Sequence, residues 1–308
     1  MSSAAADRPS FASARAIPGL LRLMRVNRKY LHAEPAREHL RERSLRPLAY
    51  GPPRRLRSDV EIEVRRRAGW PIYTLTPKRG RVRGAVVYTH GGGWVNEISK
   101  QHWGVCADIA AEAGLAVTVP IYPLVPFATA SQVVPVVAEI ALEQRTEYGN
   151  VCLAGDSAGG QIALSAAVLL RDQYGVTLPR TVLIAPALDL SMNNPEIDIV
   201  LPTDPWLGRK GIQVFIEYWR GELPLDDPRV SPLCAELGGL GPLTIFCGSR
   251  DIVYPDTKLL VEKARGAGVE VEFHDGVGLV HVYPLTPTPE GKAARKVIFA
   301  RLASAFNQ

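Results

Sequence analysis

Short, continuously apolar runs alternate with longer helical runs along most of this 308-residue chain. The apolar runs have the length of buried strands and lie at 84–89, 115–120, 151–154, 181–187, 243–247 and 269–273. Runs with the length and spacing of helices lie at 101–113, 130–147, 158–174, 257–267 and 291–306. Strands that are apolar on both faces and separated by helices belong to a mostly parallel sheet that helices cover on both sides. The sequence therefore predicts a doubly wound α/β fold.

Three segments do not follow this alternation. Residues 59–64 alternate acidic and apolar side chains, which predicts a half-buried strand at the edge of the sheet. Residues 17–48 predict one or two basic helices, in which Leu20 and Met24 are interleaved with Arg22 and Arg25. Residues 193–233 are rich in proline and contain one helix-like run at 212–219. The basic helices and the proline-rich segment are therefore candidates for a cap over a functional site.

Positive charge is concentrated at the N-terminus. The first 70 residues carry 16 Lys and Arg against 7 Asp and Glu, whereas the whole chain carries 36 against 31 and a net charge of +5. We interpret this stretch as solvated helical faces, with contact to a membrane surface or an acidic partner as the alternative. No run of about 18 apolar residues predicts a transmembrane helix. No aromatic and Arg spacing predicts binding to nucleic acid.

Four cysteines, at 106, 152, 234 and 247, lack the spacing of a zinc site. Cys152 and Cys247 lie in predicted strands, where cysteine usually acts as a small apolar side chain. Residues 1–15 faintly resemble an organellar transit peptide, but we treat them as part of the fold or as a frayed end. We therefore expect a cytoplasmic protein without a metal, and peripheral membrane association is the alternative.

The string Gly155-Asp156-Ser157-Ala158-Gly159 directly follows a predicted strand and directly precedes an apolar helix. It is the G-x-S-x-G pattern, in which a sharp strand-to-helix turn exposes the serine oxygen above the sheet. Glycine is needed two residues to either side because the backbone passes too closely for a side chain. A glycine-rich helix start capped by serine is the plainer alternative. The setting between strand and helix favours Ser157 as a nucleophile.

A second glycine-rich string, His90-Gly91-Gly92-Gly93-Trp94, also follows a predicted strand. Its backbone N–H groups, together with that of Ala158, would form an oxyanion hole. A phosphate-binding loop is the rival interpretation, but no Gly-Lys-Ser/Thr follows. We expect His90 to brace the loop rather than to act as a base.

A serine nucleophile needs a base, and the base needs an orienting carboxylate. We favour His281, in the loop after the last predicted strand, over His274. The carboxylate should follow the strand at 243–247, where Asp251 lies closer to the strand end than Asp256. The resulting order Ser157, Asp251, His281 is the order of the α/β-hydrolase fold. Asp256 stays open as the alternative acid.

With these motifs the chain resembles the hormone-sensitive-lipase-like (bacterial family IV) esterases of the α/β-hydrolase fold. The resemblance spans about 60–305 and rests also on Tyr122-Pro123-Leu124-Val125-Pro126 and on the string from Asp227 to Leu233. It implies a catalytic triad of Ser157, Asp251 and His281, and oxyanion donors from Gly91, Gly92 and Ala158, with Gly93 shaping the loop. It also implies a cap formed largely from N-terminal helices. We therefore expect cap helices at 1–58 and a catalytic domain at 59–308, with a cap insertion at about 190–228.

The resemblance implies hydrolysis of short- to medium-chain carboxylic esters without a cofactor. The expected partner is a small-molecule ester and not a nucleic acid, and homodimers are common among similar proteins. An amide-cleaving relative of the arylformamidase or deacetylase type keeps the same triad and is one alternative. A ligand-binding protein on the same scaffold is another, and a lipase that uses the basic helices on a membrane surface is a third.

Overall fold

The computed structural model describes residues 14–307 and contains one eight-stranded sheet. The strands lie side by side in the order β1-β2-β4-β3-β5-β6-β7-β8. The strands from β4 to β8 are parallel, and β2 runs antiparallel to both of its neighbours. Their bounds are β1 Val60–Arg67, β2 Trp70–Pro77, β3 Ala85–Thr89, β4 Ala116–Pro120, β5 Val151–Asp156, β6 Thr181–Ile184, β7 Leu243–Gly248 and β8 Val271–Gly276. The expected mostly parallel α/β sheet is confirmed.

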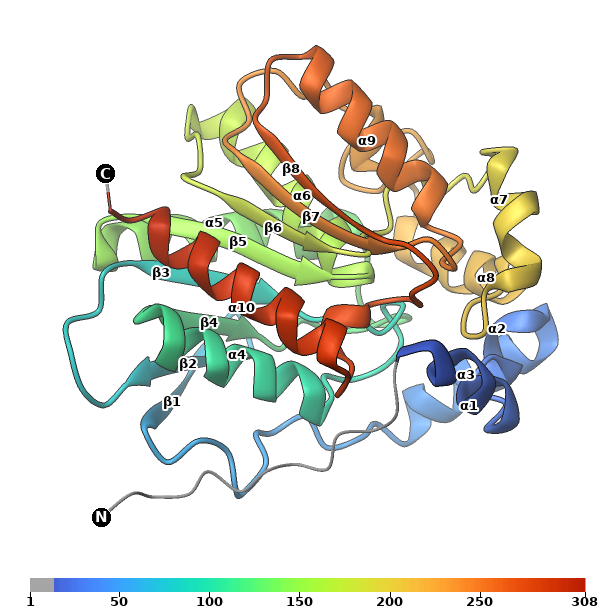
Figure 1. Ribbon diagram of the computed structural model, residues 1–308, viewed down its shortest axis with the longest axis horizontal. Coiled ribbons are helices and arrows are strands. Elements are labelled where there is room, and N and C mark those ends of the chain that lie inside the picture. Colours follow the sequence, from blue (N-terminus) through green and yellow to red (C-terminus); the bar gives the residue numbers. More distant parts are fainter. Residues whose placement is uncertain (1–13, 308) are drawn as a thin grey trace.

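Helices pack on both faces of this sheet (Figure 1). One face is covered by α4 (Lys100–Ala113) and α10 (Pro289–Ser304), and the other by α5 (Ala130–Tyr148), α6 (Ala158–Tyr174) and α9 (Tyr254–Gly266). The buried strand β3 shows why both faces need cover. Its Val87 belongs to the core beneath α5 and α6, and its Val86 to the core beneath α4 and α10. Successive side chains of a strand point to opposite faces, so a strand that is apolar throughout has to be buried on both.

The remaining helices gather at one end of the sheet (Figure 1). They are α1 (Ile17–Leu23), α2 (Arg28–Leu31) and α3 (Ala33–Leu45) from the N-terminal part, and α7 (Glu196–Val200) and α8 (Arg209–Arg220) from the proline-rich segment. The two groups are packed together, because the rings of Tyr30 on α2 and Phe215 on α8 meet edge to face at 6.1 Å. Segments that are far apart in the chain thus form one layer over the carboxyl ends of the strands.

Several sequence expectations need correction. The strand β2 was not expected, because Pro71 interrupts its pattern. Proline has no backbone N–H to donate to a neighbouring strand, so it usually argues against a strand. The basic segment 17–48 forms three helices rather than one or two. The strand β6 ends at Ile184 instead of 187, since the chain turns at Ala185, where φ is +45°. The expectation for residues 1–15 falls almost entirely outside the described residues.

Candidate active site

Ser157 lies on the sharp turn between β5 and α6. Its φ of 52° and ψ of −121° are strained for a residue with a side chain. The turn closes because glycines allow the backbone to pass closely. A Cβ on Gly159 would lie 2.0 Å from the Thr89 carbonyl oxygen, and one on Gly155 would lie 2.4 Å from the Gly159 carbonyl oxygen. The glycine spacing therefore has the steric cause that the sequence predicted.

The structure brings Ser157, His281 and Asp251 together at this turn. Nε2 of His281 lies 2.9 Å from Oγ of Ser157, and Nδ1 of His281 lies 2.6 Å from Oδ2 of Asp251. Because a carboxylate only accepts hydrogen bonds, Nδ1 carries the proton toward Asp251, and Nε2 is left to accept from the serine hydroxyl. Asp256, the alternative acid, instead accepts a hydrogen bond from Nδ2 of Asn194 at 2.7 Å. His274 lies within β8, where its ring stacks on Phe246.

The electrostatic surroundings of His281 favour its protonated form. Burial by itself lowers the pKa of this imidazole, but the charge and hydrogen bond of Asp251 outweigh burial, and the net pKa is raised above its ordinary value. Asp204 and Asp156 add smaller effects in the same direction. An imidazole with a raised pKa accepts a proton readily. It can act as a base only at a solution pH at which it is neutral.

Asp204 is a buried residue next to the triad that sequence reasoning missed. Its Oδ2 accepts the backbone N–H of Ile252, next to Asp251, at 2.9 Å, and its Oδ1 accepts the N–H groups of Trp206 and Leu207. Burial and the charge of Asp251 raise the pKa of Asp204 to about 6. No local signal marks this aspartate, because it precedes Asp251 by 47 positions in the chain. It joins the proline-rich segment to the loop that carries Asp251.

The segment His90–Trp94, which we call the glycine loop, is held by a buried carboxylate. Oδ1 of Asp156 accepts the N–H of Gly91 at 3.0 Å and the hydroxyl of Tyr88 at 2.8 Å, and its Oδ2 lies 3.1 Å from Nε2 of His102. Although burial acts to raise the pKa of Asp156, His102 and the other donors outweigh it, so the net pKa is lowered. Neither Asp156 nor His102 was assigned a role in the site from the sequence, and their side chains meet across 54 positions of the chain.

This hydrogen bond corrects the expectation for Gly91. Its N–H already has an acceptor in Asp156, so it is not free to hold a second oxygen. The N–H groups of Gly92, Gly93 and Ala158 have no acceptor within residues 14–307. His90 is fully buried, contacts the Gly91 carbonyl through Nδ1 at 2.7 Å and stacks on Tyr122. Its pKa is lowered to about 4, chiefly by burial, so the ring is neutral and positioned to support the loop.

A pocket of about 570 Å³ opens above Ser157 and is lined mostly by apolar side chains. Its base is formed by Ser157, His281 and the glycine loop. Its walls come from the N-terminal helices and the proline-rich segment, and include Ile17, Leu20, Leu21, Val26, Trp206, Leu207, Ile212 and Ile216. Trp206 meets the His281 ring edge to face at 5.8 Å. This volume is that of a site for a small organic molecule.

Two further findings concern metals and membranes. Across the part of the chain that the structure describes, no three or more His, Cys, Asp or Glu side chains are grouped as metal ligands would be. No helix within that part is both long and apolar enough to cross a membrane. All four cysteines are free thiols, and only Cys234 is exposed.

A mostly parallel sheet with a serine on the turn after its central strand, followed along the chain by Asp251 and His281, is the arrangement of the α/β hydrolases. Residues 86–285 match a protein family described as having the alpha/beta hydrolase fold, and the chain belongs to this family. The family membership confirms the fold class that the motifs predicted.

Similar proteins carry esterase and lipase names. A triacylglycerol lipase of Mycobacterium tuberculosis is 36% identical over 61% of this chain, which spans only 39% of that protein. An acetyl-hydrolase of Streptomyces hygroscopicus is 31% identical over 72% of this chain and 76% of its own length. Among solved structures, an esterase of the bacterial hormone-sensitive lipase family has the same fold, with a TM-score of 0.80, 24% identity and coverage of 97% of this chain and 100% of that one.

Proposed function

We propose that this protein is a serine hydrolase that cleaves short- to medium-chain carboxylic esters. The observation that carries the proposal is the continuous hydrogen-bonded chain from Ser157 through His281 to Asp251 at the base of an apolar pocket. Relatives named esterase, acetyl-hydrolase and carboxylesterase support the same reaction type.

In this mechanism Oγ of Ser157 attacks the ester carbonyl carbon while Nε2 of His281 takes the hydroxyl proton. The resulting imidazolium is stabilised by Asp251, and His281 then gives the proton to the departing alcohol. Water attacks the acyl-enzyme by the same route, with His281 again as the base, and releases the acid. The proton taken from Ser157 goes to the departing alcohol, and the proton taken from water returns to Ser157. Water is therefore the only co-reactant of the ester.

The oxyanion hole in this proposal is formed by the N–H groups of Gly92, Gly93 and Ala158. This set differs from the expected one by Gly93 in place of Gly91, because Asp156 accepts the Gly91 N–H. The positive φ angles of Gly92 (132°) and Gly93 (64°) are backbone conformations that favour glycine. Donors fixed in this way need no reorganisation as negative charge develops on the carbonyl oxygen.

We further propose that the N-terminal helices and the segment at about 190–228 act as a cap that selects the substrate. Trp219 of α8 stacks on Trp94 of the glycine loop at 5.7 Å, and both indole N–H groups donate to Oε1 of Gln161. These contacts support a cap anchored to the catalytic part of the chain. The apolar pocket walls that the cap contributes favour an apolar acyl or alcohol group.

A peripheral contact with membranes is a second proposal for the cap. Leu23 and Met24 of the α1 region are 81% and 65% exposed, and Arg25 and Arg28 are exposed beside them. Exposed apolar side chains flanked by cations bind anionic lipid surfaces. Vesicles containing phosphatidylserine should bind the protein at low salt, and binding should weaken with added salt and with Leu23→Glu. Equal binding by both proteins would contradict the contact.

The test of the main proposal is hydrolysis of a p-nitrophenyl ester series from acetate to palmitate, by the wild type and by Ser157→Ala. The proposal expects turnover of the shorter chains and its loss in the variant by several orders of magnitude. Matched anilides distinguish an amide-cleaving enzyme. If the wild type is as inactive as Ser157→Ala on every ester, the proposal is wrong.

A further inference from the structure

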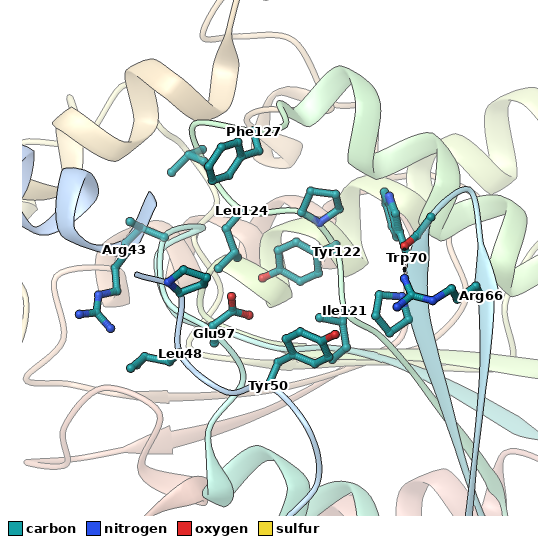
Figure 2. A pocket seen from close by; sticks show the side chains of 16 residues that line it. Arg43, Leu48, Tyr50, Arg66, Trp70, Glu97, Ile121, Tyr122, Leu124 and Phe127 are labelled. Atoms are coloured by element: carbon teal, nitrogen blue, oxygen red, sulfur yellow. Dashed lines mark hydrogen bonds between the residues drawn. The ribbon is translucent and has the colours of Figure 1, made fainter. Parts of the chain in front are cut away.

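A second pocket of about 350 Å³ lies next to the pocket above Ser157. It is lined largely by apolar and aromatic side chains, among them Tyr50, Trp70, Tyr122, Leu124 and Phe127 (Figure 2). Two side chains line both pockets, namely Leu48 and Glu97. These two residues therefore form the partition between the site of the reaction and the second pocket.

Glu97 is an unusual residue for this partition. Its carboxylate forms no hydrogen bond or ion pair with any residue in the described range 14–307. Figure 2 shows it between Leu48 and the rings of Tyr50 and Tyr122. The Tyr122 hydroxyl cannot donate a hydrogen bond to this carboxylate, because it already donates to the His90 carbonyl at 2.6 Å. Arg43, at the edge of the same pocket, pairs with Glu42 at 2.6 Å.

The carboxylate of Glu97 consequently depends on water for its solvation. It is half-buried, and burial raises the pKa of this group above its ordinary value. An apolar chain that passed Leu48 into the second pocket would displace the remaining water from a charged group. Removing water from an unpaired charge is strongly unfavourable, whereas the same chain would gain from contact with the pocket walls beyond.

We propose that Glu97 sets the upper limit of substrate chain length by holding an unpaired carboxylate between the two pockets. The inference rests on the proposed ester hydrolysis and adds a specificity-determining residue to it. Short acyl or alcohol groups fit within the pocket above Ser157 without passing Glu97 into the second pocket. Longer groups that extend past Glu97 into the second pocket are disfavoured by its charge.

The test compares kcat/KM for p-nitrophenyl butanoate and p-nitrophenyl dodecanoate, both below their aggregation limits. Glu97→Gln keeps the shape of the side chain and removes its charge, and Glu97→Leu also makes it apolar. We expect the dodecanoate-to-butanoate ratio to rise about tenfold in Glu97→Gln and further in Glu97→Leu, a change equivalent to about 1.4 kcal/mol or more. Circular dichroism and thermal unfolding report correct folding of each variant, and the ratio cancels any change in activity that is common to both esters.

Leu48→Ala is the matched control, because it widens the same partition and leaves the carboxylate in place. The inference expects a smaller rise in the ratio for this variant than for Glu97→Gln. An unchanged ratio in both Glu97 variants would overturn it, and so would a rise in Leu48→Ala with none in Glu97→Gln, since volume rather than charge would then set the limit. Failure of the wild type on butanoate itself would instead contradict the proposed function.

Discussion

The backbone N–H of Gly91 donates to Oδ1 of Asp156 over 3.0 Å, although the two residues are 65 positions apart in the chain. Asp156 directly precedes Ser157, and Gly91 directly precedes the two glycines whose N–H groups have no acceptor among the described residues. One buried carboxylate thus fixes the glycine loop relative to the nucleophile turn. The geometry of the proposed oxyanion hole therefore depends on this contact as well as on the glycines.

Replacing Asp156 by Asn should lower kcat more than it changes KM. The amide keeps the size of the carboxylate but presents an N–H₂ group to neighbours that are themselves donors, so the glycine loop shifts. We expect kcat to fall about ten- to hundredfold, less than the 10²–10³ that removal of a donor itself costs. Steady-state kinetics measure both constants. Tyr88→Phe removes one of the donors to Asp156 and should have a milder effect, and a wild-type kcat in Asp156→Asn would contradict this role.

The pH dependence of kcat/KM should report His281. The base acts only when neutral, and its pKa is raised above the ordinary histidine value of 6.5, so activity should decline as the pH falls through a midpoint above 6.5. The negative charges that face the imidazole are Asp251, Asp204 and Asp156. A pH profile of the free enzyme measures the midpoint, and a midpoint below 6.5 would show that burial prevails over these charges.

Asp204→Asn should move that acidic limb to lower pH. The variant removes one negative charge that favours the imidazolium, so His281 loses its proton at a lower pH. The wild-type limb should also be broadened, because Asp204, with a pKa of about 6, titrates in the same range. If Asp204 only holds the Ile252 backbone, the variant will lower kcat at every pH and leave the midpoint where it is.

Ser157→Gly should be more stable than Ser157→Ala, although both should be inactive. A side chain at a φ of 52° stores strain of about 1–3 kcal/mol, which alanine keeps and glycine relieves. The gain is reduced by about 0.5–1 kcal/mol, because glycine makes the unfolded chain more flexible. Denaturant unfolding of the two variants measures the difference. Greater stability of the alanine variant would argue against strain at the nucleophile turn.

Two glycine-to-alanine changes should have opposite effects on the free energy of unfolding. In Gly159→Ala the new Cβ would lie 2.0 Å from the Thr89 carbonyl oxygen and 2.5 Å from that of His90, so backbone has to move and the protein should be strongly destabilised. Gly104 lies within α4 and has open space at its Cβ position. Gly104→Ala should therefore stabilise the fold by about 0.5–1 kcal/mol. Equal effects in thermal unfolding would contradict the steric argument.

Much of the fold could be predicted because its signals are local. The helix α6 begins and ends where the sequence predicted, at Ala158 and Tyr174, since its glycine-rich start and the C-cap Gly175 mark both ends. The strand β2 was missed because Pro71 interrupts its pattern. Its place in the sheet comes from pairing with β1 and β4.

The sequence by itself determined the α/β class, the turn that carries Ser157 and the loop of three glycines, because each depends on backbone conformation and side-chain periodicity within a few residues. Only the tertiary structure decided that Asp251 rather than Asp256 faces His281 and that the Gly91 N–H donates to Asp156. It also decided that Asp204 holds the backbone next to Asp251 and that Glu97 lines the pocket. Those relationships join residues from different elements, and a hydrogen bond or a shared pocket wall between distant segments leaves no periodic trace in the chain.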